Sequence, residues 1–130
     1  MPMWIEYRNN PVRSDGVGDC SVRAISKALD LTWEQAYVRL ALNGFLMGDV
    51  VSSDTVWGAL LRQNGFRRYA VADTCPDCYT VGEFCQDHPN GTYVIKSPGH
   101  VATVVDGNLY DSWDSSGQTV IYYWTNKEET

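Results

Sequence analysis

The sequence predicts a single α+β domain over residues 1–130, in which N-terminal helices pack on a C-terminal antiparallel sheet. Three observations support this fold class. The chain has 130 residues, 44% of them hydrophobic and 20% charged, which is typical of one folded domain. Apolar residues of the first half recur at helical spacing, whereas the second half consists of short β-branched and aromatic runs between turn signals. Helices and strands segregated in this way favour α+β over α/β.

The helices are recognised by their apolar spacing and their capping residues. Val22, Ile25 and Leu29 form one stripe of the first helix. The predicted helices are residues 20–29 with Asp19 as N-cap, 32–43 with a Thr32–Gln35 capping box and Gly44 as its stop, 53–64 after a cap at Ser52 or Ser53, and 80–87 with a Thr80–Glu83 capping box. The second of these is expected to bury Trp33, Ala36, Tyr37, Leu40 and Ala41.

Strands account for most of the remaining chain. They are predicted at residues 4–8, 92–96, 100–105, 109–113 and 119–124, with a turn-rich loop over residues 9–19 and a frayed tail at residues 127–130. Asp106-Gly107, set between two apolar runs, predicts a two-residue hairpin with a type I′ turn.

Charge and hydropathy exclude several classes of partner. The net charge of −6 and the isoelectric point of about 4.7 argue against a binder of nucleic acid, and the small cluster Arg62, Arg67 and Arg68 does not reverse this. No apolar run is long enough to cross a membrane, so no membrane partner is expected. The N-terminus lacks a basic segment followed by an apolar stretch, which predicts no signal peptide and a cytoplasmic protein with reduced cysteines.

Cys20 is the candidate nucleophile. It falls in the first turn of the predicted helix, where the helix dipole and unpaired backbone N–H groups favour the thiolate over the thiol. Gly16 and Gly18 leave room for a substrate beside it. The alternative is a cysteine that merely packs in the core, because cysteine is among the most buried residue types.

His100 and Asp111 are the candidate partners of this thiol. If Asp106-Gly107 forms a two-residue turn, Ala102 lies opposite Asp111, and His100 shares the face of Ala102. Asp111 is then the diagonal neighbour of His100, whereas Asp114 has the opposite parity and points away. A surface histidine and a carboxylate that only ends a strand are the alternatives. Thiol, imidazole and carboxylate are together the groups that acyl transfer needs.

These motifs carry a resemblance. The sequence has a cysteine at a predicted helix start, then His100 opening the strand His100-Val101-Ala102-Thr103-Val104, and then Asp111-Ser112-Trp113. This order resembles that of the papain-like cysteine peptidases, which have Cys, then His, then Asn or Asp. The resemblance implies a papain-like fold and a Cys20–His100–Asp111 triad. The whole chain is also similar to small cysteine proteases encoded in bacteriophage and prophage genomes, which implies a bacterial host.

Two departures from the family pattern concern the oxyanion site and the size. The family usually carries a Gln shortly before the cysteine, but no Gln precedes Cys20 here. Asn9 or Asn10 is a candidate donor in its place, together with the Cys20 backbone N–H, although a turn-forming role fits both asparagines. The short chain implies a minimal cleft. By the resemblance, Trp113 covers the His–Asp hydrogen bond; its alternative is a plain core tryptophan.

A second group of thiols follows the helical half. The spacing is C-x2-C-x6-C-x2-H, over Cys75-Pro76-Asp77-Cys78, Cys85 and His88. This spacing suits a structural zinc site of four ligands. Free structural thiols are the favoured interpretation, and no other cofactor is expected. A redox pair is less favoured because no thioredoxin-like βαβ pattern surrounds it.

The sequence therefore predicts a cysteine peptidase that hydrolyses a peptide or isopeptide bond in a protein or peptide substrate. Transglutaminase-like transfer and cell-wall amide hydrolysis on the same triad stay open, and so does a non-catalytic binding module on the same fold.

Overall fold

The computed structural model describes residues 3–128 and confirms the α+β class. Within that range the elements are, in chain order, β1 (Trp4–Glu6), α1 (Cys20–Ala28), α2 (Trp33–Met47), α3 (Asp54–Gln63), β2 (Arg67–Ala70), α4 (Val81–Asp87), β3 (Thr92–Ser97), β4 (His100–Val105), β5 (Asn108–Asp111) and β6 (Tyr122–Thr125). No helix within residues 3–128 has the length and apolar character needed to cross a membrane. Residues 129 and 130 of the expected frayed tail lie outside the described range.

The strands form one sheet in the order β1-β5-β4-β3-β6-β2. It is mixed rather than antiparallel, because β1 pairs with β5 in the parallel direction while the other neighbours are antiparallel. The chain reaches this arrangement by leaving β1 through the loop and helices before returning, and such a long connection permits a parallel pair.

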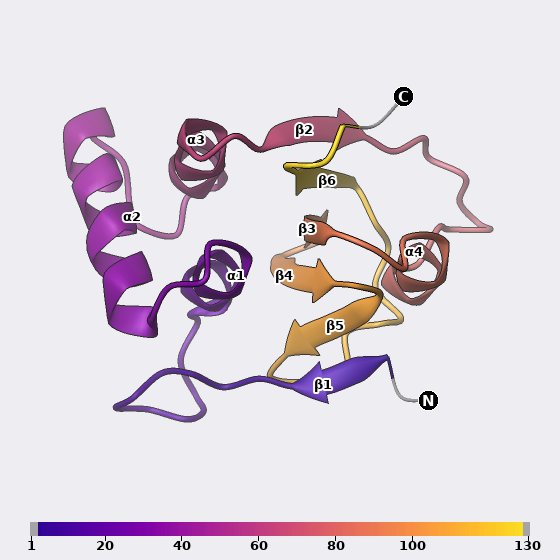
Figure 1. Cartoon of the computed structure of the whole chain (residues 1–130), viewed down its shortest axis with the longest axis horizontal. Helices are drawn as coiled ribbons and strands as arrows, with labels where there is room; N and C mark the ends of the chain where they lie inside the picture. Colours follow the sequence, from indigo (N-terminus) through magenta and orange to yellow (C-terminus); the bar gives the residue numbers. More distant parts are fainter. Residues whose placement is uncertain (1–2, 129–130) are drawn as a thin grey trace.

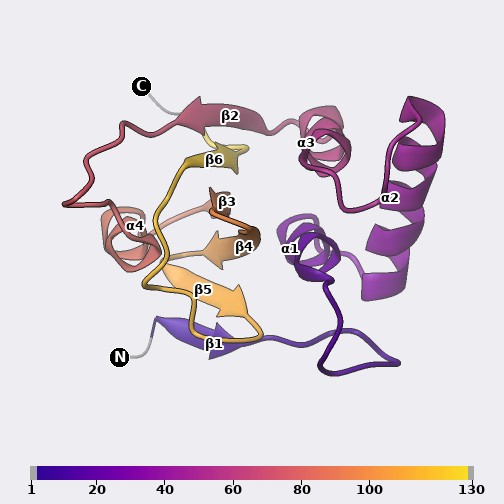
Figure 2. The same cartoon turned by 180° about the vertical axis from the view of Figure 1, so that it is seen from behind.

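The helices cover both faces of the sheet (Figures 1 and 2). α1 packs along β4, and α2 packs on α1 and α3 rather than on strands. The apolar core on this face joins the three helices to Val94, Val101 and Trp124 of the sheet. α4 covers the opposite face, where Phe84 and Cys85 pack with apolar residues of β3, β4 and β5. The predicted packing of N-terminal helices on the sheet is thus confirmed for one face.

Helix α2 continues past its predicted stop. Gly44 is a buried helical residue, and a Cβ there would lie 2.8 Å from the carbonyl oxygen of Asp49, so this glycine allows the following chain to pack closely on the helix. The left-handed C-cap is Gly48 instead, with φ of 70°. The expected buried face holds for Ala36 and Leu40, but Tyr37 is exposed.

Several strands differ from prediction: β1 ends at Glu6 rather than at Arg8, and β5 ends at Asp111 rather than at Trp113. β2 was not predicted, because it is an edge strand whose side chains are mostly exposed and therefore lack an apolar alternation. The last strand, β6, begins at Tyr122 rather than at Thr119, since Thr119 forms an isolated bridge with Thr80 before the chain joins the sheet. β6 pairs with β3 on one side and β2 on the other.

Candidate active site

Cys20 is the first residue of α1, as predicted, and it is not part of a disulfide. Asp19 precedes the helix but its side chain makes no capping hydrogen bond. Its carboxylate instead pairs with Arg23, at 2.8 Å, and accepts a hydrogen bond from the Trp33 indole at 3.0 Å. Asp19 therefore occupies the N-cap position, as predicted, but its side chain does not cap the helix, because a guanidinium one helical turn later takes the carboxylate.

The β4–β5 hairpin brings His100 and Asp111 together as strand parity predicts. Val105 pairs with Asn108, and the two turn residues, Asp106 and Gly107, have φ of 50° and 78°. Positive φ at both positions is the signature of a type I′ turn, so this prediction is confirmed. The Nε2 atom of His100 lies 2.6 Å from a carboxylate oxygen of Asp111.

Asp111 is held by four donors in a fully buried position. One of its carboxylate oxygens meets His100 and accepts the Ser115 hydroxyl at 2.5 Å. The other accepts the Ser112 backbone N–H at 2.8 Å and Arg23 at 3.2 Å. Burial would raise the pKa of Asp111, but the bonds from His100, Ser115 and Ser112 and the charge of His100 outweigh it and lower that pKa. The carboxylate therefore stays ionised.

The His100 imidazole and the Val101 backbone lie close enough to the Cys20 thiol to act on its pKa by hydrogen bonding. Burial raises the pKa of Cys20, but these bonds and the charges of His100 and Arg23 lower it overall. Burial likewise lowers the pKa of His100, whereas its bonds to Asp111 and Cys20 raise that pKa to about 9. A lowered thiol pKa beside a raised imidazole pKa favours a thiolate–imidazolium pair near neutral pH.

Nε2 of His100 is occupied by Asp111, so Nδ1 is the ring nitrogen left for the thiol. The carboxylate thus fixes both the ring orientation and its tautomer. These are the contacts in which a histidine can accept a proton from a thiol and return it to a leaving group.

Arg23 is the site residue that sequence reasoning missed. Its guanidinium is nearly buried and bridges Asp19 and Asp111, at 2.8 and 3.2 Å. It lies one helical turn after Cys20 and lowers the pKa of that thiol. The available signal is the i, i+4 spacing of Asp19 and Arg23, which places a guanidinium beside a carboxylate at the start of the helix.

Trp113 lies against His100 from the solvent side. Its ring centroid is 5.1 Å from that of His100, and its side chain is 44% exposed. The ring is therefore placed to shield His100 from water, and the alternative of a plain core tryptophan is wrong.

The two asparagines predicted as oxyanion donors are engaged elsewhere. The Asn9 amide donates to the Tyr7 hydroxyl at 3.0 Å and to the Ser26 hydroxyl at 2.7 Å, which uses both of its N–H groups. The Asn10 oxygen accepts two backbone N–H groups and forms a turn, while its amide points to Asp19 at 3.3 Å. The turn-forming interpretation holds for Asn10, and Asn9 cannot be the donor in this arrangement.

The predicted zinc ligands do not assemble. Cys75 and Cys78 form a disulfide, so these two thiols are neither reduced nor available to a metal. Cys85 lies in the apolar core under α4, where burial raises its thiol pKa to about 11. His88 stacks on the Phe84 ring, and its Nδ1 lies 2.9 Å from the Phe84 carbonyl oxygen. Residues 3–128 contain no group of three or more His, Cys, Asp or Glu side chains able to hold a metal.

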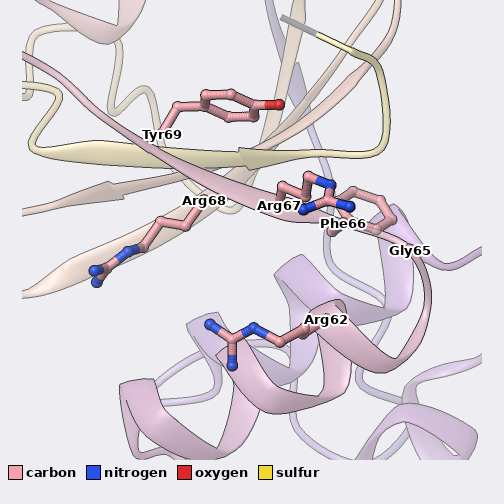
Figure 3. Close-up of a pocket in the computed structure, with 6 residues that line it drawn as sticks. All are labelled: Arg62, Gly65, Phe66, Arg67, Arg68 and Tyr69. Atoms are coloured by element: carbon pink, nitrogen blue, oxygen red, sulfur yellow. The ribbon is translucent and has the colours of Figure 1, made fainter.

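The arginine cluster lies away from the triad. Arg62, Arg67 and Arg68 line an open pocket of about 620 Å³ between the end of α3 and strand β2 (Figure 3). Arg62 lies over the Trp124 ring and Arg68 over the Tyr122 ring, at 5.2 and 5.0 Å. Two of the three guanidinium groups are thus positioned by cation–π contacts.

Comparison with known proteins adds no assignment: the chain matches no protein-family profile, no curated protein and no solved structure.

Proposed function

We propose that this protein is a thiol-dependent hydrolase of the papain-like type, which cleaves a peptide or isopeptide bond in a protein or peptide substrate. The supporting observation is the grouping of Cys20, His100 and Asp111 from α1, β4 and β5, in which His100 lies 2.6 Å from Asp111 and lowers the pKa of Cys20. A packing cysteine needs no histidine, and a histidine that only packs needs no buried carboxylate at 2.6 Å. The raised pKa of His100 and the lowered pKa of Cys20 fit a nucleophile that is active near neutral pH.

The reaction follows from these three groups. The Cys20 thiolate attacks the scissile carbonyl carbon, and the electron pair of the C=O bond moves to the oxygen. When that pair returns, the C–N bond breaks and the leaving amine takes the proton of the His100 imidazolium, which leaves a thioester. Neutral His100 then takes a proton from water while the hydroxide attacks the thioester. Breaking the C–S bond releases the carboxylic acid and restores thiolate and imidazolium, while Asp111 stays ionised throughout.

The start of α1 supplies a place for the developing oxyanion. The first N–H groups of a helix have no carbonyl partner within it, and the carboxylate of Asp19 does not cap them. The backbone N–H of Cys20 is then a donor next to the attacking sulfur, where helix dipole and hydrogen bond act together.

A pH profile of alkylation by iodoacetamide tests the proposal. Below pH 7 the Cys20 thiol should react at least tenfold faster than a model thiol, since its pKa is lowered. His100→Ala should remove this excess. The chain has only two histidines, so His88→Ala is a matched control that should leave the profile unchanged. A wild-type profile that coincides with the model thiol would favour the non-catalytic binding module and overturn the proposal.

Product analysis separates hydrolysis from transfer. Mass spectrometry of a cleaved peptide should show a free carboxylic acid if water attacks the thioester. A new amide formed with an added amine would point to transglutaminase-like transfer, and release from peptidoglycan fragments alone would point to a cell-wall amidase. We take the cytoplasm of a bacterium that carries the phage as the setting, on the resemblance alone.

A further inference from the structure

The arginine pocket between the end of α3 and β2 carries positive charge without an internal counter-charge. Its volume is about 620 Å³, and its walls include the guanidinium groups of Arg62, Arg67 and Arg68 (Figure 3). Among residues 3–128, no carboxylate lines this pocket or forms an ion pair with any of the three arginines. All three residues are exposed. In a chain of net charge −6, this surface is a local positive site that can attract an anion.

The pocket follows the outer edge of strand β2. This strand is the last of the sheet and pairs with β6 on one side, and no strand within the described range pairs with its other side. Residues 65–69 all line the pocket, so it runs along the backbone of this edge. In an antiparallel pair, alternate residues turn their N–H and C=O groups away from the partner strand. The edge of β2 therefore offers backbone groups to which a further strand can pair.

The arginines flank this edge on both faces of the sheet. Arg62 and Arg68 lie over two aromatic rings of β6 that pack in the core on the side of α1 and α3. The ring of Tyr69 stacks on a β6 tyrosine that packs on the side of α4. Figure 3 shows Arg68 and Tyr69 leaving β2 on opposite sides. Since side chains alternate along a strand, Arg67 shares the face of Tyr69.

This arrangement fits an extended acidic peptide better than a compact anion. Guanidinium groups that leave a strand on opposite faces do not converge on one phosphate. An added strand places its own side chains alternately on the two faces, so the carboxylates of one extended segment can meet arginines on both. Backbone pairing then contributes affinity, and the carboxylates contribute the charge that selects the segment. A long polyanion such as a nucleic acid is disfavoured by the net negative charge of the chain.

Protection against aggregation is the alternative role for charged side chains on an edge strand, because they discourage pairing with other chains. Here the guanidinium groups of Arg62 and Arg68 are each positioned by an aromatic ring, at 5.2 and 5.0 Å. The guanidinium group also has the planar fork of donors that matches a carboxylate. Such an edge repels basic strands but accepts an acidic one, so the two roles differ in what they predict for an acidic peptide.

We propose that the edge of β2 binds an acidic, extended segment of a partner protein, which adds to the sheet as a further strand and places its carboxylates on Arg62, Arg67 and Arg68. The site lies outside the proposed active site, so this inference goes beyond the proposed hydrolysis and does not depend on it.

Fluorescence anisotropy of labelled peptides with the full chain tests the proposal. The probe is an N-acetylated peptide of three Thr-Glu-Glu repeats, which has carboxylates on both faces when it is extended. A matched peptide carries Gln in place of every Glu. The Glu peptide should bind at least tenfold more tightly than the Gln peptide, because only the Glu peptide can pair with the guanidinium groups. Its binding should weaken as the salt concentration rises. Mass spectrometry verifies that the peptide stays intact during the measurement.

Matched variants locate the effect. Arg67→Gln and Arg68→Gln each remove one cation, on opposite faces of the edge. Arg39→Gln is the control, because Arg39 is an exposed arginine of α2 outside the pocket. Each pocket variant should weaken binding of the Glu peptide by about threefold to fivefold, and the double variant should weaken it further. Arg39→Gln makes the same change in net charge and should leave binding unchanged.

Two further measurements separate strand addition from charge attraction alone. N-methyl groups on the central residues of the Glu peptide keep its charge but remove the N–H groups that a β-ladder needs, so they should abolish binding. Amide hydrogen exchange at residues 67–70 of β2 should slow at least tenfold when the unmodified Glu peptide is bound.

Several results would overturn the inference. If the Glu peptide does not bind, binds no better than the Gln peptide, or is weakened equally by Arg39→Gln, the arginine pocket does not select acidic segments. If the N-methylated peptide binds as tightly as its parent, no strand is added to β2. If tripolyphosphate or oligo-dT binds more tightly than the Glu peptide and is weakened by the same variants, the pocket is a phosphate site instead. None of these results bears on the reactivity of Cys20, so the proposed function is tested separately.

Discussion

Replacing Asp111 by Asn tests whether the charge of this residue, rather than its shape, activates the thiol. All four groups around the carboxylate act as donors: His100, Ser115, Ser112 and Arg23. An amide has one oxygen and one NH₂ group, so its NH₂ must face one of the two donor pairs. The backbone N–H of Ser112 and the Arg23 guanidinium cannot become acceptors.

In the Asp111→Asn variant the NH₂ group must therefore face the other pair, since the hydroxyl of Ser115 can rotate and His100 can change tautomer. His100 would then accept at Nε2 and carry its proton on Nδ1, which faces Cys20. An imidazole in that tautomer cannot take the thiol proton. The variant should consequently lose thiol activation although it is nearly isosteric with the wild type.

The magnitude follows from the pKa of His100, which the fold raises from 6.5 to about 9. At about 1.4 kcal/mol per pKa unit, this rise is worth about 3 kcal/mol, or a factor of about 300 in favour of the imidazolium. Cys20 supplies part of the rise, and a thiolate of higher pKa is intrinsically the better nucleophile. We expect the iodoacetamide rate constant of Asp111→Asn at pH 6 to fall by about 30-fold.

The assay is the alkylation rate between pH 5 and 10, with urea unfolding measured on the same samples. Loss of a buried charge beside Arg23 should lower the free energy of unfolding by about 3 kcal/mol, so folding must be verified at each pH. Asp114→Asn is the matched control, because Asp114 is exposed and accepts only the Ser116 N–H among the described contacts. A folded Asp111→Asn protein whose pH profile coincides with that of the wild type would refute the reasoning.

Three further predictions concern the same buried charges and the second free thiol. Arg23→Met leaves the buried carboxylates of Asp19 and Asp111 without their cation, and it should lower the free energy of unfolding at pH 7 by about 3 kcal/mol. Because Asp111 has a lowered pKa in the folded state, this difference from the wild type should shrink as the pH falls below 4, which urea titrations at each pH would measure. Cys20→Ser removes the anion next to His100, so NMR titration should place the pKa of that ring below 9, and an unchanged value would contradict the ion pair. Burial raises the thiol pKa of Cys85 to about 11. Without reductant, iodoacetamide should therefore label the native protein once, at Cys20, and should label Cys85 only after unfolding in urea. A mass spectrum of the native protein with both labels at pH 8 would contradict this.

Local signals predicted the parts of the fold that local contacts determine. The capping boxes at Thr32–Gln35 and Thr80–Glu83 form as reciprocal hydrogen bonds, since each needs only four consecutive residues. The Asp106-Gly107 turn fixed the register of its hairpin for the same reason. Once that register was known, strand parity placed His100 beside Asp111 without further information.

Non-local features were not predictable in this way. The parallel pairing of β1 with β5 joins residues about a hundred positions apart, and no pattern within either strand records its partner. β2 carries arginines at an edge, where the apolar alternation of a half-buried strand is absent. The disulfide between Cys75 and Cys78 was not the favoured interpretation, because the same spacing also suits a metal site or free thiols.

The position of Arg23 explains how the fold holds the start of α1 next to Asp111. The residue lies on the same helix as Cys20, one turn later, and its guanidinium reaches Asp111 at the end of β5. The helix that carries Cys20, the proposed nucleophile, is therefore tied to the carboxylate that contacts His100. Without the cation, Asp19 and Asp111 would be two buried negative charges at the start of α1, and both would oppose formation of the thiolate. A carboxylate rather than an asparagine amide at position 111 thus requires a buried arginine, and Arg23 and Asp111 stabilise the site together.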